Sequence, residues 1–118
     1  MKIYIATPVN ARKEATLIEK REAAYHRVCY LQERLKVVYP DAEFHSSFDK
    51  EIAPLSKPME LLPESVVMGR CVTEVMECAA ILVDWRYENS RGCVVEHTTA
   101  VVYGKKIINA KDLDIEPE

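Results

Sequence analysis

The fold of this chain is decided by the stretch AAILVDWRYENSRGCVVEH, residues 79 to 97. Residues 80–84 form a short apolar run that ends in aspartate, which is typical of a buried strand. From residue 94 onward, apolar residues recur at helical spacing as far as Gly104, a residue type that commonly ends helices. Residues 90–92 are therefore predicted to form a strand-to-helix turn, where open α/β sheets place their ligands.

The helix after this turn has two different faces. At about 100° per residue, its valines and Thr98 lie on one side, and Glu96 points almost directly away from them. We therefore expect the valine side to pack on the sheet. Glu96 is then either a solvated helix glutamate or a carboxylate aimed into a cleft. Ala100 and Tyr103 share its side, which is thus suited to contact a loop or another subunit.

Strands and helices alternate along the whole chain. Short β-prone runs predict strands at residues 2–6, 43–47, 80–84 and 105–109. Apolar residues at helical spacing predict helices at residues 11–38 and 64–78 and after residue 90. Such alternation indicates a parallel sheet with right-handed crossovers. The predicted fold is α/β, a three-layer Rossmann-like or flavodoxin-like sandwich with a parallel sheet of four or five strands.

The remaining segments complete one domain, residues 1–118, which is long enough to bury a core. Residues 50–63 contain three prolines and form either a lid or an ordinary connection. Residues 110–118 are polar, and we expect them to lie over the surface. On the first helix, the face opposite the apolar stripe is charged and expected to be solvated; it carries Lys13, Glu14, Lys20, Arg27 and Arg34.

The composition narrows the classes of function. A net charge of −3 with no basic block argues against a nucleic-acid partner. No apolar run is long enough to span a bilayer, and the first residues do not resemble a signal peptide, so we expect a cytoplasmic protein with no membrane partner. The four cysteines form no Cys-x-x-Cys pair, and the three histidines have no zinc spacing, so we expect free thiols and no metal.

Polar side chains follow the ends of the predicted strands. They are Thr7 and Asn10 after the first strand, Asp49 after the second, and Asp84 and Trp85 after the third. Because the carboxyl ends of parallel strands share one edge of the sheet, these residues are candidates to bind a ligand. Asn10 is alternatively the N-cap of the first helix.

The turn at residues 90–92 is itself a candidate anion site. Backbone N–H groups at a helix N-terminus have no helical partner and favour a phosphate or another anion. Arg91 adds a positive charge beside Ser90, and Gly92 lets the backbone approach a ligand closely.

Three segments of the chain resemble the nucleoside 2-deoxyribosyltransferase-like superfamily, and in particular its small bacterial and phage members. The segments are MKIYIATP at residues 1–8, CAAILV at residues 78–83, and ENSRG at residues 88–92 followed by Glu96 and His97. The pattern Ser-x-Gly-x-x-x-Glu is also similar to that of the 2′-deoxynucleoside 5′-monophosphate N-glycosidases. The resemblance covers nearly the whole chain in order.

The resemblance implies an enzyme that acts on an N-glycosidic bond without a cofactor. Glu96 would attack the anomeric carbon of the sugar, the base would depart, and water or a second base would resolve the glycosyl-enzyme. Tyr4 would donate a hydrogen bond to Glu96 and orient it. Ser90 matches a serine that contacts the 5′-phosphate, which favours a nucleoside 5′-monophosphate over a nucleoside. Relatives oligomerise, so a homodimer or larger homo-oligomer is expected.

One residue departs from the family pattern. Cys71 lies where relatives tend to carry an aspartate, and a thiol does not replace a carboxylate in protonating a base. Either Asp84, Asp49 or His45 takes over, or activity is weakened, altered or lost. The alternative function is accordingly a non-catalytic nucleotide-binding or nucleotide-sensing module. The sequence does not name the base, the sugar, or the choice between hydrolase and transferase.

Overall fold

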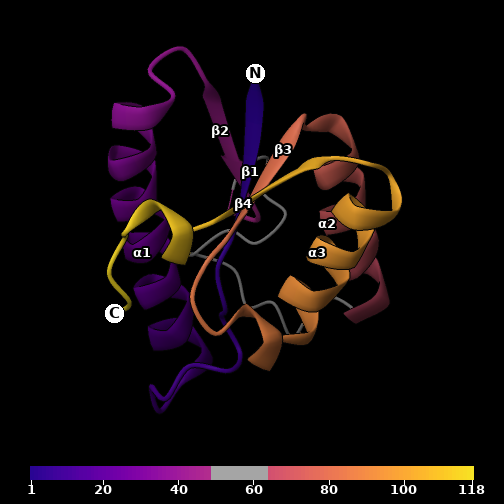
Figure 1. Cartoon of the computed structure of the whole chain (residues 1–118). Coiled ribbons are helices and arrows are strands. Elements are labelled where there is room, and N and C mark those ends of the chain that lie inside the picture. Colours follow the sequence, from indigo (N-terminus) through magenta and orange to yellow (C-terminus); the bar gives the residue numbers. More distant parts are fainter. Residues whose placement is uncertain (49–63) are drawn as a thin grey trace.

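The computed structural model describes residues 1–48 and 64–118 (Figure 1). Asp49 and the predicted lid at residues 50–63 lie outside the described residues. No helix within the described ranges has the length and apolar character needed to cross a membrane. The elements in chain order are β1 (Lys2–Ala6), α1 (Leu17–Val38), β2 (Glu43–Ser46), α2 (Glu64–Glu77), β3 (Ala80–Val83), the 3₁₀ helix η3 (Tyr87–Asn89), α3 (Arg91–Val102), β4 (Lys106–Asn109) and the 3₁₀ helix η4 (Lys111–Leu113).

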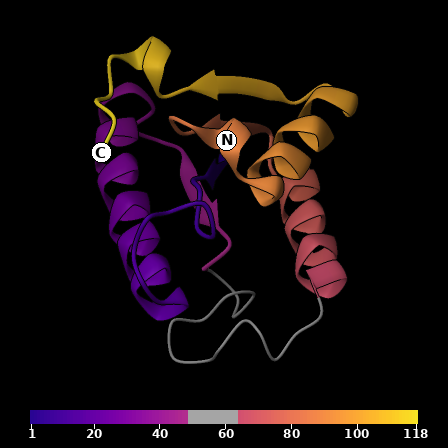
Figure 2. The same cartoon turned by 90° about the horizontal axis from the view of Figure 1, so that it is seen from below.

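The described strands form one parallel sheet in the order β2-β1-β3-β4. Helix α1 covers one face of the sheet, and α2 and α3 cover the other (Figures 1 and 2). This arrangement follows from right-handed crossovers, because the chain moves from β1 to β2 in one direction and then to β3 and β4 in the opposite direction. The predicted three-layer α/β sandwich is thereby confirmed, with its topological switch point between β1 and β3.

The central strands β1 and β3 are buried on both faces, which explains why they are almost uniformly apolar. Successive side chains alternate between the faces. Ile3, Ile5 and Leu82 belong to the core beside α1. Tyr4 and Ile81 belong to the core beside α2 and α3. This alternation decides on which side of the sheet each polar candidate lies.

Helix α1 begins at Leu17, six residues later than the predicted start at residue 11. Its N-cap is Thr16, whose Oγ1 accepts a hydrogen bond of 3.1 Å from the backbone N–H of Glu19 and contacts the Glu19 carboxylate at 2.9 Å. This Thr-x-x-Glu pattern is a capping box. The alternative in which Asn10 is the N-cap was therefore wrong. Residues 7–16 instead connect β1 to α1 at the carboxyl edge of the sheet.

Helix α3 presents the opposite face to the sheet from the one predicted. Its buried residues are Cys93, Glu96, Thr99 and Ala100. Its valines face outward, with exposed fractions of 56% at Val101 and 69% at Val102. The small side chains at positions 93 and 100 let the helix approach the sheet closely, and Tyr4 supplies a buried partner for Glu96. The carboxylate face is consequently the inner one, so the valine side does not pack on the sheet as expected, and the alternative of a solvated glutamate was wrong.

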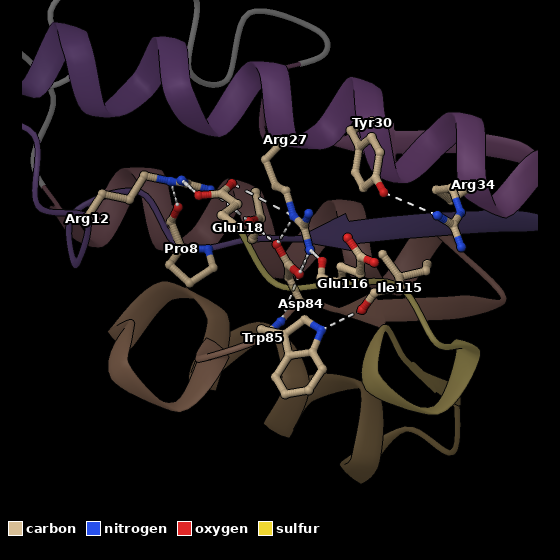
Figure 3. Close-up of polar contacts among 11 residues, drawn as sticks. Pro8, Arg12, Arg27, Tyr30, Arg34, Asp84, Trp85, Ile115, Glu116 and Glu118 are labelled. Atoms are coloured by element: carbon tan, nitrogen blue, oxygen red, sulfur yellow. Dashed lines mark hydrogen bonds and ion pairs between the residues drawn. The ribbon is translucent and has the colours of Figure 1, made fainter.

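The segment after β4 was expected to lie over the surface, and for Ala110 and Ile115 this was wrong. Ala110 and Ile115 are buried in the core beside α1. The indole Nε1 of Trp85 donates a hydrogen bond of 2.7 Å to the backbone oxygen of Ile115. These two apolar anchors bring Glu116 and Glu118 back towards the carboxyl ends of β1 and β3 (Figure 3).

Candidate functional site

The polar residues near the carboxyl edge of the sheet form two clusters on opposite faces. Tyr4 points from β1 towards α3, where it meets Glu96. Thr7 and Asp84 lie three residues after Tyr4 and one residue after β3, respectively, and both contact groups on the α1 side. We call the first cluster the Tyr4–Glu96 pair and the second the Asp84 network.

The Tyr4–Glu96 pair is a buried hydrogen bond between segments 92 residues apart in sequence. The Tyr4 hydroxyl donates to Oε2 of Glu96, and the two side chains are 0% and 5% exposed. Cys71 of α2 is also buried and lies close enough to affect the ionisation of both. Three elements that are distant in sequence thus bring a carboxyl, a phenol and a thiol together.

The environment of this pair controls which groups carry protons. Burial raises the pKa of Glu96 to about 7, although hydrogen bonds with Tyr4 and Cys71 act in the opposite direction by stabilising the carboxylate. Burial, followed by the negative charge of Glu96, raises the pKa of Tyr4 well above its usual value and that of Cys71 to about 12. At neutral pH, Tyr4 and Cys71 therefore keep their protons, while Glu96 is divided between its charged and neutral forms. A carboxyl with this balance is suited to nucleophilic or acid–base chemistry.

The Asp84 network fixes the ends of β1 and β3 to α1 (Figure 3). Arg27 donates to both carboxylate oxygens of Asp84 at 2.9 Å, and this bidentate pair is almost completely buried. The Thr7 hydroxyl donates to Oδ2 at 2.7 Å, and the Trp85 backbone N–H donates to Oδ1 at 2.8 Å. Each carboxylate oxygen of Asp84 thus accepts two hydrogen bonds, so its lone pairs are committed to this network.

Arg12 and Glu118 extend this network outward. Arg12 donates from Nε to the backbone oxygen of Pro8 at 2.6 Å and from Nη2 to Thr7 Oγ1 at 3.2 Å. Its Nη1 donates to the carboxylate of Glu118. A hollow of about 230 Å³ lies here, between the β1–α1 connection, the end of β3 and residues 117–118. Neither member of the Tyr4–Glu96 pair lines this hollow, so the two features are separate.

Helix α3 begins after residue 90 as predicted, but Arg91 and Gly92 belong to the helix rather than to a turn, and η3 lies between β3 and α3. Ser90 is the N-cap, and its Oγ accepts a hydrogen bond of 3.4 Å from the N–H of Cys93. Arg91 is exposed at the first helical position. A β-carbon at Gly92 would meet the Met68 side chain at 3.6 Å, which is an ordinary contact. The neighbours of Gly92 in the described part of the chain therefore do not require a glycine at this position.

The sequence candidates are thus only partly gathered together. Thr7, Asp84 and Trp85 meet in the Asp84 network, and Ser90, Arg91 and Gly92 lie on the same helix as Glu96. Asn10 is exposed, and its backbone oxygen accepts a hydrogen bond of 3.1 Å from Lys20 Nζ. Asp49 lies outside the described residues.

Sequence reasoning missed Arg12, Arg27 and Glu118. Arg27 was assigned to the solvated face of the first helix, yet only 6% of it is exposed. A signal was present, because Arg27 stands three residues after Ala24 and four before Leu31, both buried in the stripe. An aspartate at the end of a buried strand also requires a partner, and an arginine on the neighbouring helix provides one.

Comparisons of the chain with protein-family models, with curated proteins and with solved structures found no match. Within residues 1–48 and 64–118, no group of three or more His, Cys, Asp or Glu side chains is placed to hold a metal ion. The arguments about function consequently start from the geometry of the two clusters.

Proposed function

We propose that this protein cleaves or exchanges the N-glycosidic bond of a nucleoside 5′-monophosphate or a nucleoside, with Glu96 as the nucleophile. One observation carries the proposal: the Tyr4 hydroxyl donates a hydrogen bond to a buried Glu96 carboxyl whose pKa is raised to about 7. These are the two residues for which the sequence resemblance implies nucleophilic and orienting roles. The raised pKa supports the same roles, because a poorly solvated carboxylate is a more reactive nucleophile.

The chemistry follows the retaining logic of covalent glycosyl transfer. An oxygen of Glu96 forms a bond to the anomeric carbon while the C–N bond breaks, and the electron pair of that bond leaves with the base, which takes a proton from water. Water or a second base then displaces the carboxylate from the sugar. Tyr4 fixes the orientation of the carboxylate throughout and remains protonated because of its own raised pKa.

The N-terminus of α3 supports a nucleotide rather than a bare nucleoside. Glu96 lies six positions after Ser90, or about 9 Å along the helix axis. A phosphate near Ser90 would benefit from the helix dipole and from the Arg91 charge. The sugar of such a ligand would then extend along α3 in the direction of Glu96.

A second function is favoured by Cys71. Its thiol lies beside Tyr4 and Glu96, and with a pKa of about 12 it does not carry the charge of the family aspartate. The buried Glu74 of α2 also raises the pKa of Cys71, but it occupies a different position from the family aspartate that Cys71 replaces. The alternative proposal is therefore a nucleotide-binding or nucleotide-sensing module without turnover.

A substrate panel tests the two proposals against each other. Ribo- and deoxyribonucleosides and their 5′-monophosphates are incubated with the protein, and free base is measured by chromatography. We expect monophosphates to be cleaved faster, with a rate that falls about tenfold per pH unit below about pH 7 as Glu96 gains a proton.

The variant Cys71→Asp is the companion to this panel. An increase in rate would identify the natural protein as a weakened enzyme. Nucleotide binding without base release, in both the natural protein and the variant, would contradict the enzymatic proposal and favour the binding module.

We also propose that the protein is a cytoplasmic homodimer or larger homo-oligomer. All four cysteines are free thiols, which supports a reducing compartment. The outward face of α3 supports self-association, because it exposes a row of large apolar side chains at one end of the helix. These are Val101, Val102 and Tyr103, with exposed fractions of 56%, 69% and 59%.

Charge on this face should disrupt the oligomer. We expect Val102→Glu to shift the protein to a monomer, because an ionised carboxylate would be buried in the interface. Light scattering coupled to size exclusion measures the mass at micromolar concentration. Val37→Glu on α1 is the control, since Val37 is 82% exposed on a different surface and its change should leave the mass unaltered. A monomeric natural protein would contradict the proposal directly.

A further inference from the structure

We propose that Arg12 and Arg27 form an anion-binding site that the side chain of Glu118 occupies in this structure. The ligand class is a small molecule bearing a phosphate or similar oxyanion, which would replace the Glu118 carboxylate. The site lies on the α1 face, and the inference does not depend on the proposed role of Glu96.

The first support is the contrast in burial between the two sides of the ion pairs. The side chains of Arg12 and Arg27 are 8% and 5% exposed, whereas that of Glu118 is 42% exposed. Arg12 donates to the Glu118 carboxylate, and Arg27 Nε lies 3.8 Å from its other oxygen (Figure 3). Two buried cations are thus met from the solvent side by a carboxylate that an ion in solution can replace.

The second support is the charge balance. Arg27 is already neutralised by its bidentate contact with Asp84. Arg12 also donates hydrogen bonds to the Pro8 carbonyl and the Thr7 hydroxyl, which are neutral, so Glu118 supplies the carboxylate that balances its charge. Withdrawal of Glu118 would leave one uncompensated positive charge in a poorly solvated place. Such a charge strongly favours the entry of another anion.

The third support is that Arg12 is held in a fixed orientation by groups other than Glu118. Its Nε and Nη2 are engaged by Pro8 and Thr7, so Nη1 stays aimed at the same point when Glu118 departs. A planar guanidinium fixed in this way matches the geometry of an oxyanion. The site is therefore preorganised and does not require reordering upon binding.

The fourth support concerns the segment that carries Glu118. Ile115 is the last buried anchor, at 2% exposure, and its backbone is held by Trp85 and Ala110. The three residues that follow span up to about 10 Å when extended, so Glu118 can leave the arginines without disturbing the core. Residues 116–118 contact α1 through the 2.7 Å hydrogen bond from Arg27 Nη2 to the Glu116 carbonyl and through the ion pair between Arg27 and Glu118.

The position in the fold is also that of a ligand site. The arginines lie at the carboxyl ends of β1 and β3, the switch point of the sheet. The adjoining hollow of about 230 Å³ is lined partly by Pro117 and Glu118 themselves, so their displacement would enlarge it. Ligand pockets are commonly somewhat larger than this, about 300–1,000 Å³.

The test compares two variants that lose the same charge. Binding of inorganic phosphate is measured by isothermal titration calorimetry for the natural protein, Glu118→Gln and Glu116→Gln. We expect Glu118→Gln to bind phosphate at least about tenfold more tightly than the natural protein, because the competing carboxylate is gone. Glu116→Gln should show no such gain, since Glu116 contacts Arg27 through its backbone carbonyl.

Two second-site variants in the Glu118→Gln background identify the cation. Arg12→Gln should abolish the gain in phosphate affinity. Arg12→Lys keeps the positive charge needed for folding but lacks the planar guanidinium, so it should reduce the gain. Circular dichroism verifies that each variant is folded. Equal phosphate affinity in Glu118→Gln and Glu116→Gln, or a gain that survives both changes at Arg12, would overturn the proposal. This titration measures phosphate binding and not base release. Its failure is therefore distinguishable from failure of the proposed enzymatic function.

Discussion

Replacement of Glu96 by glutamine is expected to reduce base release by roughly a thousandfold or more, and at the same time to stabilise the protein above pH 7. The loss of activity follows from the chemistry, because a neutral amide does not attack the anomeric carbon. The gain in stability follows from burial, because the folded protein ionises Glu96 only at a cost. A single substitution thus tests the proposed chemical role of Glu96 separately from its effect on stability.

The pH dependence of the stability gain can be derived from the raised pKa. The folded pKa of about 7 exceeds the ordinary value of 4.5, so between these values the folded state holds a proton that the unfolded state releases. The free energy of unfolding therefore falls as pH rises from about 4.5 to 7 and stays lower above that range. At 1.36 kcal/mol per pKa unit, the effect is about 3 kcal/mol at pH 8.

Denaturant unfolding at pH 5 and pH 8 measures this effect. Glu96→Gln should be more stable than the natural protein at pH 8, and most of the difference should disappear at pH 5. Glu88→Gln removes the same charge from an exposed residue of η3 and is the matched control. A Glu96→Gln variant that differs from the natural protein by the same amount at both pH values would contradict a raised pKa.

The second large effect is expected at Asp84. Asp84→Ala should lower the free energy of unfolding by about 3–5 kcal/mol, because it leaves Arg27 charged and buried without its carboxylate. The Thr7 hydroxyl and the Trp85 N–H lose their acceptor as well. Since small domains have total stabilities of about 5–15 kcal/mol, such a variant would be only marginally folded.

Guanidinium unfolding of a small set of variants tests this expectation. Asp112→Ala removes an exposed carboxylate from η4 and should change stability by less than about 0.5 kcal/mol. The double variant Asp84→Ala with Arg27→Leu should recover part of the loss, because both charges leave the interior together. A loss below about 1 kcal/mol in Asp84→Ala would show that Arg27 finds compensation elsewhere.

The strands could be predicted from sequence to within about one residue at each end. β1 and β3 are short, continuous apolar runs bounded by polar residues, and such runs have few alternative structures. The start of α1 could also have been predicted, because Thr16 and Glu19 form a capping box, but the predicted helix was begun at residue 11, directly after the turn. The alternation of strands and helices also predicted a parallel sheet, whereas the strand order β2-β1-β3-β4 came from the structure.

The inward face of α3 could not be predicted from hydropathy. Valines occupy one side of this helix, and on that criterion they belong in the core. The outcome is decided instead by Tyr4, 92 residues away in sequence, which satisfies Glu96 inside the protein. The resemblance connected these two residues, whereas the periodicity of the helix alone pointed the wrong way.

The Asp84 network shows a different limit. Asp84, Thr7 and Trp85 were placed at the correct edge of the sheet, because parallel strands bring their carboxyl ends together. Their partner Arg27 was missed, since it was assigned to the charged face opposite the apolar stripe, although it lies between the buried Ala24 and Leu31. Pairing of this kind depends on which helix packs over which strand, and hydropathy carries no information about it.

The outward valines of α3 also bear on the behaviour of the protein as a solute. Attraction between apolar surfaces is strengthened by excluded salts such as sulfate, whereas attraction between charges is screened by any salt. With a net charge of only −3, long-range repulsion between molecules is weak. Ammonium sulfate should therefore promote association through this helix, and a change in sodium chloride should affect it much less. Purification in low-salt buffer would accordingly underestimate the tendency of the molecules to associate.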